Sequence, residues 1–197
     1  DEDKNKFDAK LYGTKDSKVE LNSKDDTDKV LDAIKDNDFV VKEIKRTEKN
    51  RKPYPPFTTS TLQQEASKYL NFTAQKTMML AQQLYEGIEI KGNGTVGLVS
   101  YIRTDSVRIS DEAYETASEY IKENLGEKYL PDERNIYKTK KNAQDAHEAI
   151  RPTYATMTPD KIKESLSNDQ YKLYKLIWER FISSQMAPAV YESMTVT

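Results

Sequence analysis

The sequence contains no cysteine and only one histidine in 197 residues. Without cysteine the chain forms neither a disulfide bond nor a thiolate metal site, which is consistent with a reducing compartment. A single histidine excludes a metal site built only from histidines. No apolar run approaches the roughly 20 residues of a membrane-spanning helix, and no signal peptide is visible. These absences exclude disulfide bonds within the chain and predict no membrane-spanning helix.

An excess of charge of one sign is also missing. The chain carries 31 basic and 33 acidic side chains, which gives a formal net charge of −2. A protein that binds polyanions through bulk charge is normally basic, so any nucleic-acid site here must be a local patch. Only 36% of the residues are hydrophobic and 32% are charged, which predicts a small core beneath a large polar surface.

The two ends of the chain have strand-like patterns. Apolar and polar residues alternate over residues 7–11, from Phe39 to Thr47, and over residues 190–196, and each stretch predicts a strand. Three prolines within residues 53–56 forbid a helix and predict an extended linker. Thr27 is the predicted N-cap of a short helix, whose apolar residues we expect to be buried: Val30, Leu31 and Ile34.

The middle of the chain has helical patterns. The spacings Ser60-x-x-Gln63 and Ser167-x-x-Gln170 are typical of capping boxes, which begin helices. Asn93-Gly94 predicts a tight turn between two short β-prone pieces. Further N-caps are predicted at Thr73, Ser110 and Thr158. We therefore predict an α+β fold, with a mainly helical domain over residues 60–187 and strand-rich ends over residues 1–59 and 188–197.

The stretch from Gly97 to Ser106 is the most informative for function. In an extended backbone, Tyr101 and Arg103 point to one side and Ile102 to the other. A guanidinium stays charged and binds phosphate bidentately, so it can neutralise the anion that would repel an attacking phenolate. The chain has 13 tyrosines, and an ordinary tyrosine beside a solvated arginine is the alternative interpretation.

The run Tyr101-Ile102-Arg103-Thr104-Asp105-Ser106 resembles the active-site tyrosine motif of type IA DNA topoisomerases, in the form typical of the bacterial enzymes. Three further stretches resemble the same family in the same order: residues 56–66, 76–86 and 146–152. The resemblance implies a helical domain, carrying the tyrosine, inserted into a β-rich arch domain that is only partly present here. The chain starts at Asp1 without methionine and ends in a strand-like pattern, so we expect a piece of a longer protein.

The resemblance also implies roles for three residues. Tyr101 is the expected nucleophile, which attacks single-stranded DNA and forms a transient 5′-phosphotyrosyl link that can be resealed without ATP. Arg103 is expected to stabilise the transition state, and His147 to lie near the scissile phosphate and donate a hydrogen bond or relay a proton. In the full-length enzyme this chemistry allows strand passage and relaxation of negatively supercoiled DNA.

Three neighbouring residues are candidate DNA contacts: Ser100, Asp105 and Arg151. Ser100 and Asp105 flank the motif and are expected to position DNA or the arginine, but Asp105 could equally cap a helix. Arg151 could touch phosphate or brace its loop. If residues 143–150 formed a helix, His147 and Arg151 would share one of its faces.

The expected partners are single-stranded DNA and the remaining domains of the parent enzyme. The resemblance implies a Mg²⁺ ion in the full-length enzyme, held by an acidic domain that this chain lacks, and a cytoplasmic, nucleoid-associated location. We expect no metal site in the chain itself, no relaxation activity by the chain alone, and weak DNA affinity. The alternative function is a non-catalytic module that binds single-stranded DNA with the same fold.

Overall fold

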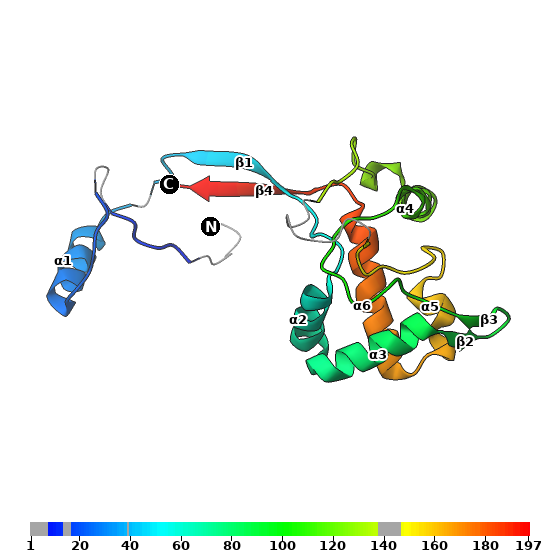
Figure 1. The fold of residues 1–197 in the computed structure, drawn as a ribbon. Helices are drawn as coiled ribbons and strands as arrows, with labels where there is room; N and C mark the ends of the chain where they lie inside the picture. Colours follow the sequence, from blue (N-terminus) through cyan, green and yellow to red (C-terminus); the bar gives the residue numbers. More distant parts are fainter. Residues whose placement is uncertain (1–7, 14–16, 39, 138–146) are drawn as a thin grey trace. The chain divides into compact units, whose positions relative to one another are not determined.

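The protein is described by a computed structural model, which covers residues 8–13, 17–38, 40–137 and 147–197 (Figure 1). The chain divides into two compact units: Asp1–Arg46 with Met194–Thr197, and Thr47–Ser193. These boundaries differ from those of the two domains inferred from the sequence. The division into those two domains remains a prediction. Helices and small sheets occur together, so the predicted α+β class is confirmed.

The first unit contains one helix, α1 (Lys24–Ile34). The predicted N-cap at Thr27 is wrong, because the Ser23 side chain accepts the hydrogen bond from the Asp26 N–H and α1 begins earlier. The predicted burial is wrong as well: no residue of α1 is buried and Leu31 is 53% exposed. Val30 and Ile34 are half-buried, so the apolar side of this helix stays partly accessible.

The predicted strand over residues 7–11 is absent from its described part. Residues 8–11 are irregular, and residue 7 lies outside the described residues. Gly13 forms only an isolated bridge with Lys18. A period-two pattern needs a partner strand, and the described residues here offer none.

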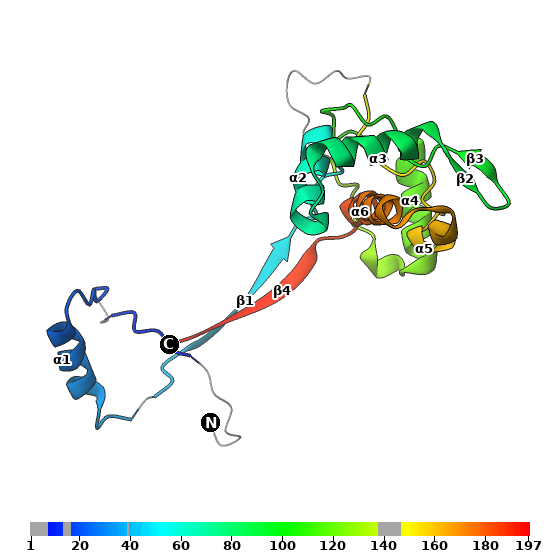
Figure 2. The same cartoon turned by 90° about the horizontal axis from the view of Figure 1, so that it is seen from below.

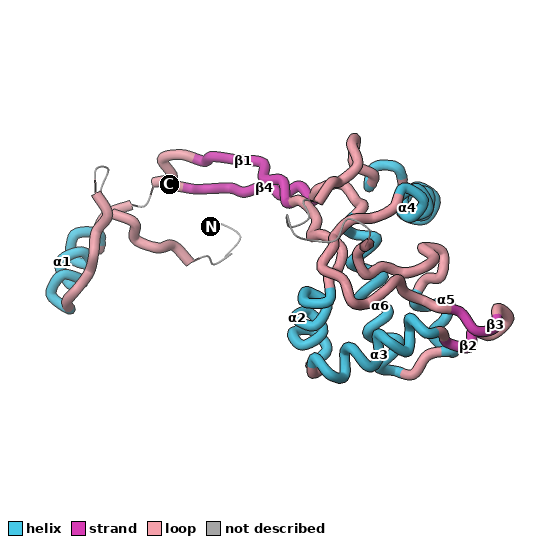
Figure 3. Tube along the Cα trace, viewed as in Figure 1, coloured by secondary structure: helices cyan, strands magenta, loops and turns pink. Residues whose placement is uncertain are grey.

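Strands β1 (Ile44–Arg51) and β4 (Ala189–Val196) pair in a two-stranded sheet, which is drawn as a long ribbon in Figure 2 and in magenta in Figure 3. The strand predicted at the C-terminal end is confirmed. The strand predicted from Phe39 to Thr47 begins later, at Ile44, and continues to Arg51; residue 39 lies outside the described residues. Every residue of β1 is exposed, so its pairing with β4 rather than burial defines the strand.

The second unit consists mainly of helices: α2 (Thr59–Leu70), α3 (Ala74–Glu86), α4 (Asp111–Asn124), α5 (Pro159–Ile162) and α6 (Asn168–Ser184), with short 3₁₀ turns at Glu127–Tyr129 and Lys163–Ser165. Helix α6 contacts α2, α3 and α5 (Figure 2). Its buried face includes Leu173, Ile177 and Phe181, while Leu176 is half-buried. Leu173 and Ile177 belong to the main core, together with Phe57, Leu62, Leu84, Leu98 and Ile150. Phe181 belongs to a second, smaller core cluster with Ala113, Ala117 and Ile121 of α4.

Most of the predicted helix starts are confirmed. Thr73, Ser110 and Ser167 accept the capping hydrogen bonds of α3, α4 and α6, and Gln170 completes the capping box of α6. Thr158 occupies the N-cap position of α5 without a side-chain bond. The box predicted at Ser60 is wrong: Thr58 and Thr61 form it, and α2 starts two residues before the predicted position. No helix in the described part of the chain is long and apolar enough to span a membrane.

A short hairpin separates α3 from the tyrosine motif. Strands β2 (Ile88–Ile90) and β3 (Gly94–Val96) pair antiparallel, which confirms the turn predicted at Asn93-Gly94. The base of this excursion is closed, because the Leu98 N–H donates to the Leu84 carbonyl at 2.7 Å. At Gly97 an added Cβ would lie 2.9 Å from the Tyr85 carbonyl oxygen.

One buried and one half-buried phenol, those of Tyr174 and Tyr137, make stability depend on pH. Burial raises the pKa of Tyr137 from 10.0 to about 12, and burial also raises the pKa of Tyr174. Above about pH 10 the unfolded chain therefore loses protons that the folded chain retains, and the free energy of unfolding falls as pH rises towards the folded pKa. Below about pH 10 the contribution of these two tyrosines to the free energy of unfolding does not change with pH. We expect the thermal midpoint to fall between about pH 10 and pH 11.5, and to fall less in Tyr174→Phe. That variant loses the bond to the Met157 carbonyl, so it is less stable at neutral pH.

Candidate active site

The tyrosine motif has no regular secondary structure and bends at Ile102 and Arg103, and its side chains alternate between surface and core. Tyr101, Arg103 and Asp105 are exposed, whereas Ile102, Thr104 and Ser106 are buried. The sequence predicted that Tyr101 and Arg103 would face away from Ile102, and this is confirmed. Burial of Ile102, which is 2% exposed, fixes the segment so that the Tyr101 phenol, 47% exposed, faces solvent.

The segment before Tyr101 is held by residues 149–153. The Ser100 hydroxyl donates to the Ala149 carbonyl at 2.8 Å and accepts from the Arg151 N–H at 3.0 Å. The Ser100 N–H donates to the Arg151 carbonyl at 2.9 Å. Ser100 therefore joins two of the stretches that resemble the family, which are about fifty residues apart in sequence.

The segment after Tyr101 is held by the start of α2. The Thr59 hydroxyl donates to the Ile102 carbonyl at 2.7 Å and accepts from the Thr104 N–H at 2.9 Å. The Thr59 N–H donates to the Thr104 carbonyl at 2.9 Å. One threonine thus satisfies backbone groups on both sides of Arg103, and it fixes the arginine relative to α2.

An open hollow of about 510 Å³ lies where these stretches meet. Three of the residues singled out in the sequence line it: Arg103, Asp105 and His147. The other lining residues are Thr58, Thr59, Ser60 and Thr104. The threonines and the serine of α2 were not singled out as site residues, although they lie in the stretch over residues 56–66 that resembles the family. The hollow has one guanidinium, one imidazole, several hydroxyl groups and one carboxylate, that of Asp105. The guanidinium and the hydroxyl groups are donors that suit a phosphate group.

Two rings flank the Tyr101 ring. The ring centroids of Tyr101 and His147 are 6.0 Å apart at an interplanar angle of 62°, and those of Tyr101 and Tyr85 are 5.8 Å apart at 70°. Edge-to-face contacts of this kind are favourable and limit the rotamers of the central ring. Tyr85, near the C-terminal end of α3, was missed as a site residue; the resemblance of residues 76–86 to the family was the available indication.

Arg151 is held by its own loop. Its Nε and a terminal nitrogen lie 2.9 and 2.8 Å from one carboxylate oxygen of Glu148, and the guanidinium also donates to the Pro152 carbonyl. Residues 147–150 are not helical, and residues 143–146 lie outside the described residues, so the shared helix face with His147 is not found. These contacts favour the bracing role for Arg151, and its contact with DNA stays a prediction.

Asp105 does not cap a helix. The next helix, α4, is capped by Ser110, so that alternative is wrong. Its exposed carboxylate lines the hollow beside Arg103. The roles proposed for Ser100, Asp105 and the three catalytic candidates remain predictions, because their positions alone do not establish chemistry.

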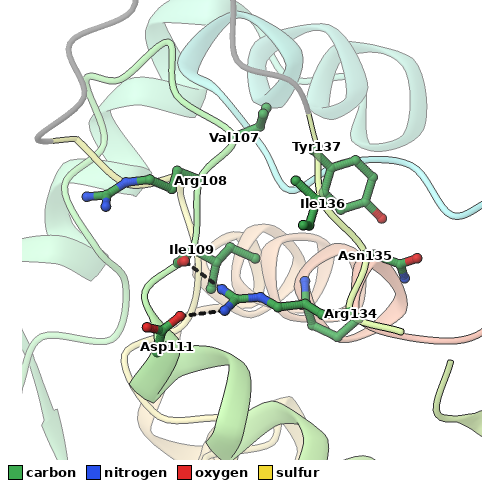
Figure 4. Close-up of a pocket in the computed structure, with 9 residues that line it drawn as sticks. Val107, Arg108, Ile109, Asp111, Arg134, Asn135, Ile136 and Tyr137 are labelled. Carbon is green, nitrogen blue, oxygen red and sulfur yellow. Dashed lines mark hydrogen bonds and ion pairs between the residues drawn. The ribbon is translucent and has the colours of Figure 1, made fainter. Parts of the chain in front are cut away.

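A second hollow, of about 290 Å³, lies just beyond the motif and shares no lining residue with the first (Figure 4). Arg134 points into it, donating to the Asp111 carboxylate and to the Ile109 carbonyl. Its guanidinium also lies 4.5 Å from the Tyr114 ring centroid. These contacts hold the first turn of α4 against residues 134–137. The position of Arg134 in this hollow is therefore explained by a structural role.

No group of three or more histidine, aspartate or glutamate side chains in the described part of the chain is arranged to hold a metal ion. The described residues therefore do not fit the Mg²⁺ ion that the family implies, and no chemical step is derived through a metal here.

The sequence model of the DNA topoisomerases matches residues 2–197. The chain belongs to the DNA topoisomerase family. Its fold is similar to that of full-length topoisomerase I from Thermotoga maritima, with 46% sequence identity and a TM-score of 0.71. The match covers 85% of this chain and 26% of the Thermotoga chain, so this topoisomerase chain spans about a quarter of that protein. Together the two matches place it with the bacterial type IA enzymes, a family of isomerases.

Proposed function

We propose that this chain carries the nucleophile of a type IA DNA topoisomerase, and that the nucleophile is Tyr101. The observation that carries the proposal is the half-exposed Tyr101 phenol, in ring contact with His147, which lines the same hollow as Arg103. A phosphate group of single-stranded DNA in that hollow would meet a cation and hydroxyl groups within reach of the phenol.

The reaction exchanges one phosphate ester for another. The Tyr101 phenol oxygen forms a bond to phosphorus as the bond from phosphorus to the DNA 3′ oxygen breaks, leaving a 5′-phosphotyrosyl ester and a 3′-hydroxyl. The phenol proton leaves, and the 3′ oxygen gains a proton. In this proposal His147 relays a proton, and Arg103 stabilises the negative charge of the transition state. Because a phenolate is a good leaving group, the 3′-hydroxyl can reverse the reaction without ATP.

The activity of the whole enzyme rests on parts beyond this chain. We propose that the parent protein relaxes negatively supercoiled DNA by passing one strand through the transient break. Its Mg²⁺ ion would be held by a separate acidic domain. The chain alone is expected to leave supercoiled DNA unrelaxed and to bind DNA weakly.

The proposal is tested by looking for the covalent intermediate. The chain is mixed with the remainder of its parent enzyme, Mg²⁺ and a single-stranded oligonucleotide labelled on the 5′-phosphate side of the break, and is then denatured. We expect label attached to this chain, and none in Tyr101→Phe, which keeps the ring but removes the nucleophilic oxygen. Tyr85→Phe is the matched control, because it removes a hydroxyl from the neighbouring ring and keeps the ring contact.

The result also separates the two candidate functions. Label that survives in Tyr101→Phe would assign the nucleophile to another residue. No label on the wild-type chain, with the remainder shown to be folded and bound to it, would favour the non-catalytic DNA-binding module.

A further inference from the structure

A groove of about 360 Å³, separate from the candidate active site, lies in the second unit between the end of β1 and the start of β4. We call it the ribbon groove. Its cations and rings come from two distant parts of the chain: Arg51, Lys52 and Tyr54 on one side, and Arg180 and Tyr191 on the other. It shares no lining residue with the hollow beside Arg103.

Arg51 is held in place without being neutralised. It donates to the Tyr54 hydroxyl at 2.9 Å, and its guanidinium carbon lies 5.3 Å from the Tyr54 ring centroid. The neighbouring phenols of Tyr54 and Tyr191 raise the pKa of Arg51. Among the described residues, no carboxylate forms an ion pair with Arg51 or with Lys52. A guanidinium positioned by neutral phenols keeps its full charge and several free donors for an anion.

Arg180, the third cation of the groove, has a structural role. Arg180 pairs with Glu65, and its guanidinium lies 4.4 Å from the Phe57 ring centroid and 5.3 Å from that of Tyr54. It therefore fixes Tyr54, and Tyr54 in turn fixes Arg51. The charge that remains uncompensated is concentrated on Arg51 and Lys52.

Tyr191 supplies an accessible aromatic ring beside these cations. It is 52% exposed, and within the described part of the chain no other ring stacks on it. Two unpaired cations next to an exposed ring match the repeating unit of a single-stranded nucleic acid, which offers a phosphate and an unpaired base. An acidic peptide would use the cations but not the ring.

We propose that the ribbon groove is a second binding site for single-stranded DNA, in which Arg51 and Lys52 contact phosphate and a base stacks on Tyr191. The choice of DNA rests on the proposed function. Tyr54 and Thr59 are five residues apart, so the chain between them spans at most about 18 Å. Since Thr59 holds the tyrosine motif, one strand of DNA can reach from the ribbon groove to the hollow beside Arg103.

The cation contacts are tested by binding of the chain to a fluorescent oligothymidylate, measured by anisotropy over a series of salt concentrations. Each phosphate contact on single-stranded DNA contributes about 0.7 to the slope of log affinity against log salt. In the double variant Arg51→Gln/Lys52→Gln we expect the slope to shrink by about 1.4 and the affinity to fall throughout the series. The control is Lys29→Gln/Lys35→Gln, within α1 and at its C-cap, which changes net charge equally. Lys52→Gln alone should reduce the slope of log affinity against log salt by about 0.7. Because the Lys52 side chain is exposed, this variant keeps the test independent of any folding defect.

The stacking contact is tested without changing charge. Tyr191→Leu should weaken binding to the oligothymidylate by about tenfold and leave binding to a blunt duplex unchanged. Tyr69→Leu, at an equally exposed tyrosine on α2, should change neither. Circular dichroism shows whether each variant is folded.

Three results would overturn the proposal. The first is an unchanged salt slope in the variants of Arg51 and Lys52. The second is an equal loss of affinity in the control Lys29→Gln/Lys35→Gln. The third is that the variants of Arg51 and Lys52 lose binding to an acidic peptide but keep binding to the oligothymidylate. Because anisotropy does not depend on the covalent adduct, failure here leaves Tyr101 as the proposed nucleophile. If the adduct experiment fails, the anisotropy experiment can still confirm that the ribbon groove binds single-stranded DNA.

Discussion

Replacing Phe57 by alanine is expected to lower the free energy of unfolding of the second unit by about 3–5 kcal/mol. The Phe57 side chain is fully buried in the main core, and its ring also lies 4.4 Å from the guanidinium carbon of Arg180. Truncation removes the ring from the core and leaves a cavity that the surrounding helices cannot fill. The Phe57 carbonyl accepts from the Ile150 N–H at 2.8 Å, so disorder at residue 57 also reaches the loop that holds Ser100.

The measurement is urea unfolding followed by the fluorescence of Trp178, the one tryptophan of the chain. Trp178 is half-buried on α6 and packs against the core, so its emission reports on this unit. The matched control is Tyr69→Ala, which truncates an exposed ring on α2 and should change stability by less than about 0.5 kcal/mol. A loss below about 1 kcal/mol in Phe57→Ala would contradict the central place of this ring.

Gly97→Ala is expected to reduce the rate of covalent adduct formation by about 10²-fold or more. The added Cβ would lie 2.9 Å from the Tyr85 carbonyl oxygen, and both atoms belong to or sit directly on the backbone, so the contact cannot be relieved by a side-chain rotation. Either the end of α3 or the segment leading to Tyr101 must move. A displacement of the nucleophile by about 1 Å is enough for a loss of this size.

The control for this substitution lies on the same hairpin. Gly94→Asn places a side chain where no atom lies within 4 Å, and asparagine tolerates the positive φ of 70°. Its adduct rate should equal that of the wild type. An unchanged rate in Gly97→Ala, with the variant folded, would show that the close approach to Tyr85 does not position the nucleophile.

Local patterns in the sequence predicted the local structure well. Ser110 and the Ser167–Gln170 pair were recognised as caps because capping depends on residues three positions apart. The cap of α1 was misplaced because two hydroxyl residues, Ser23 and Thr27, compete within one turn. The strand ending at Arg51 was predicted too early, since its pairing with β4 depends on residues at the other end of the chain.

In the candidate site too, features carried by local motifs were predicted, and contacts between distant parts of the chain were not. Convergence of Arg103, Asp105 and His147 was expected from their resemblance to a known motif, and the hollow brings them together. The contact of Tyr85 with Tyr101 was not expected, because α3 reaches the motif only through tertiary packing. The ribbon groove could not be predicted either: Arg51 lies next to the predicted proline linker, and no spacing rule relates it to Tyr191.

The closed base of the hairpin has a consequence for how this region can vary. The bond between Leu98 and Leu84 joins the end of α3 directly to the start of the motif, so residues 85–97 form a side loop in the path of the backbone. The tip of this loop around Gly92 can be lengthened, shortened or decorated while Tyr101, the proposed nucleophile, keeps its place. The same tip is therefore a suitable point for attaching a reporter group or grafting a short peptide in an engineered enzyme.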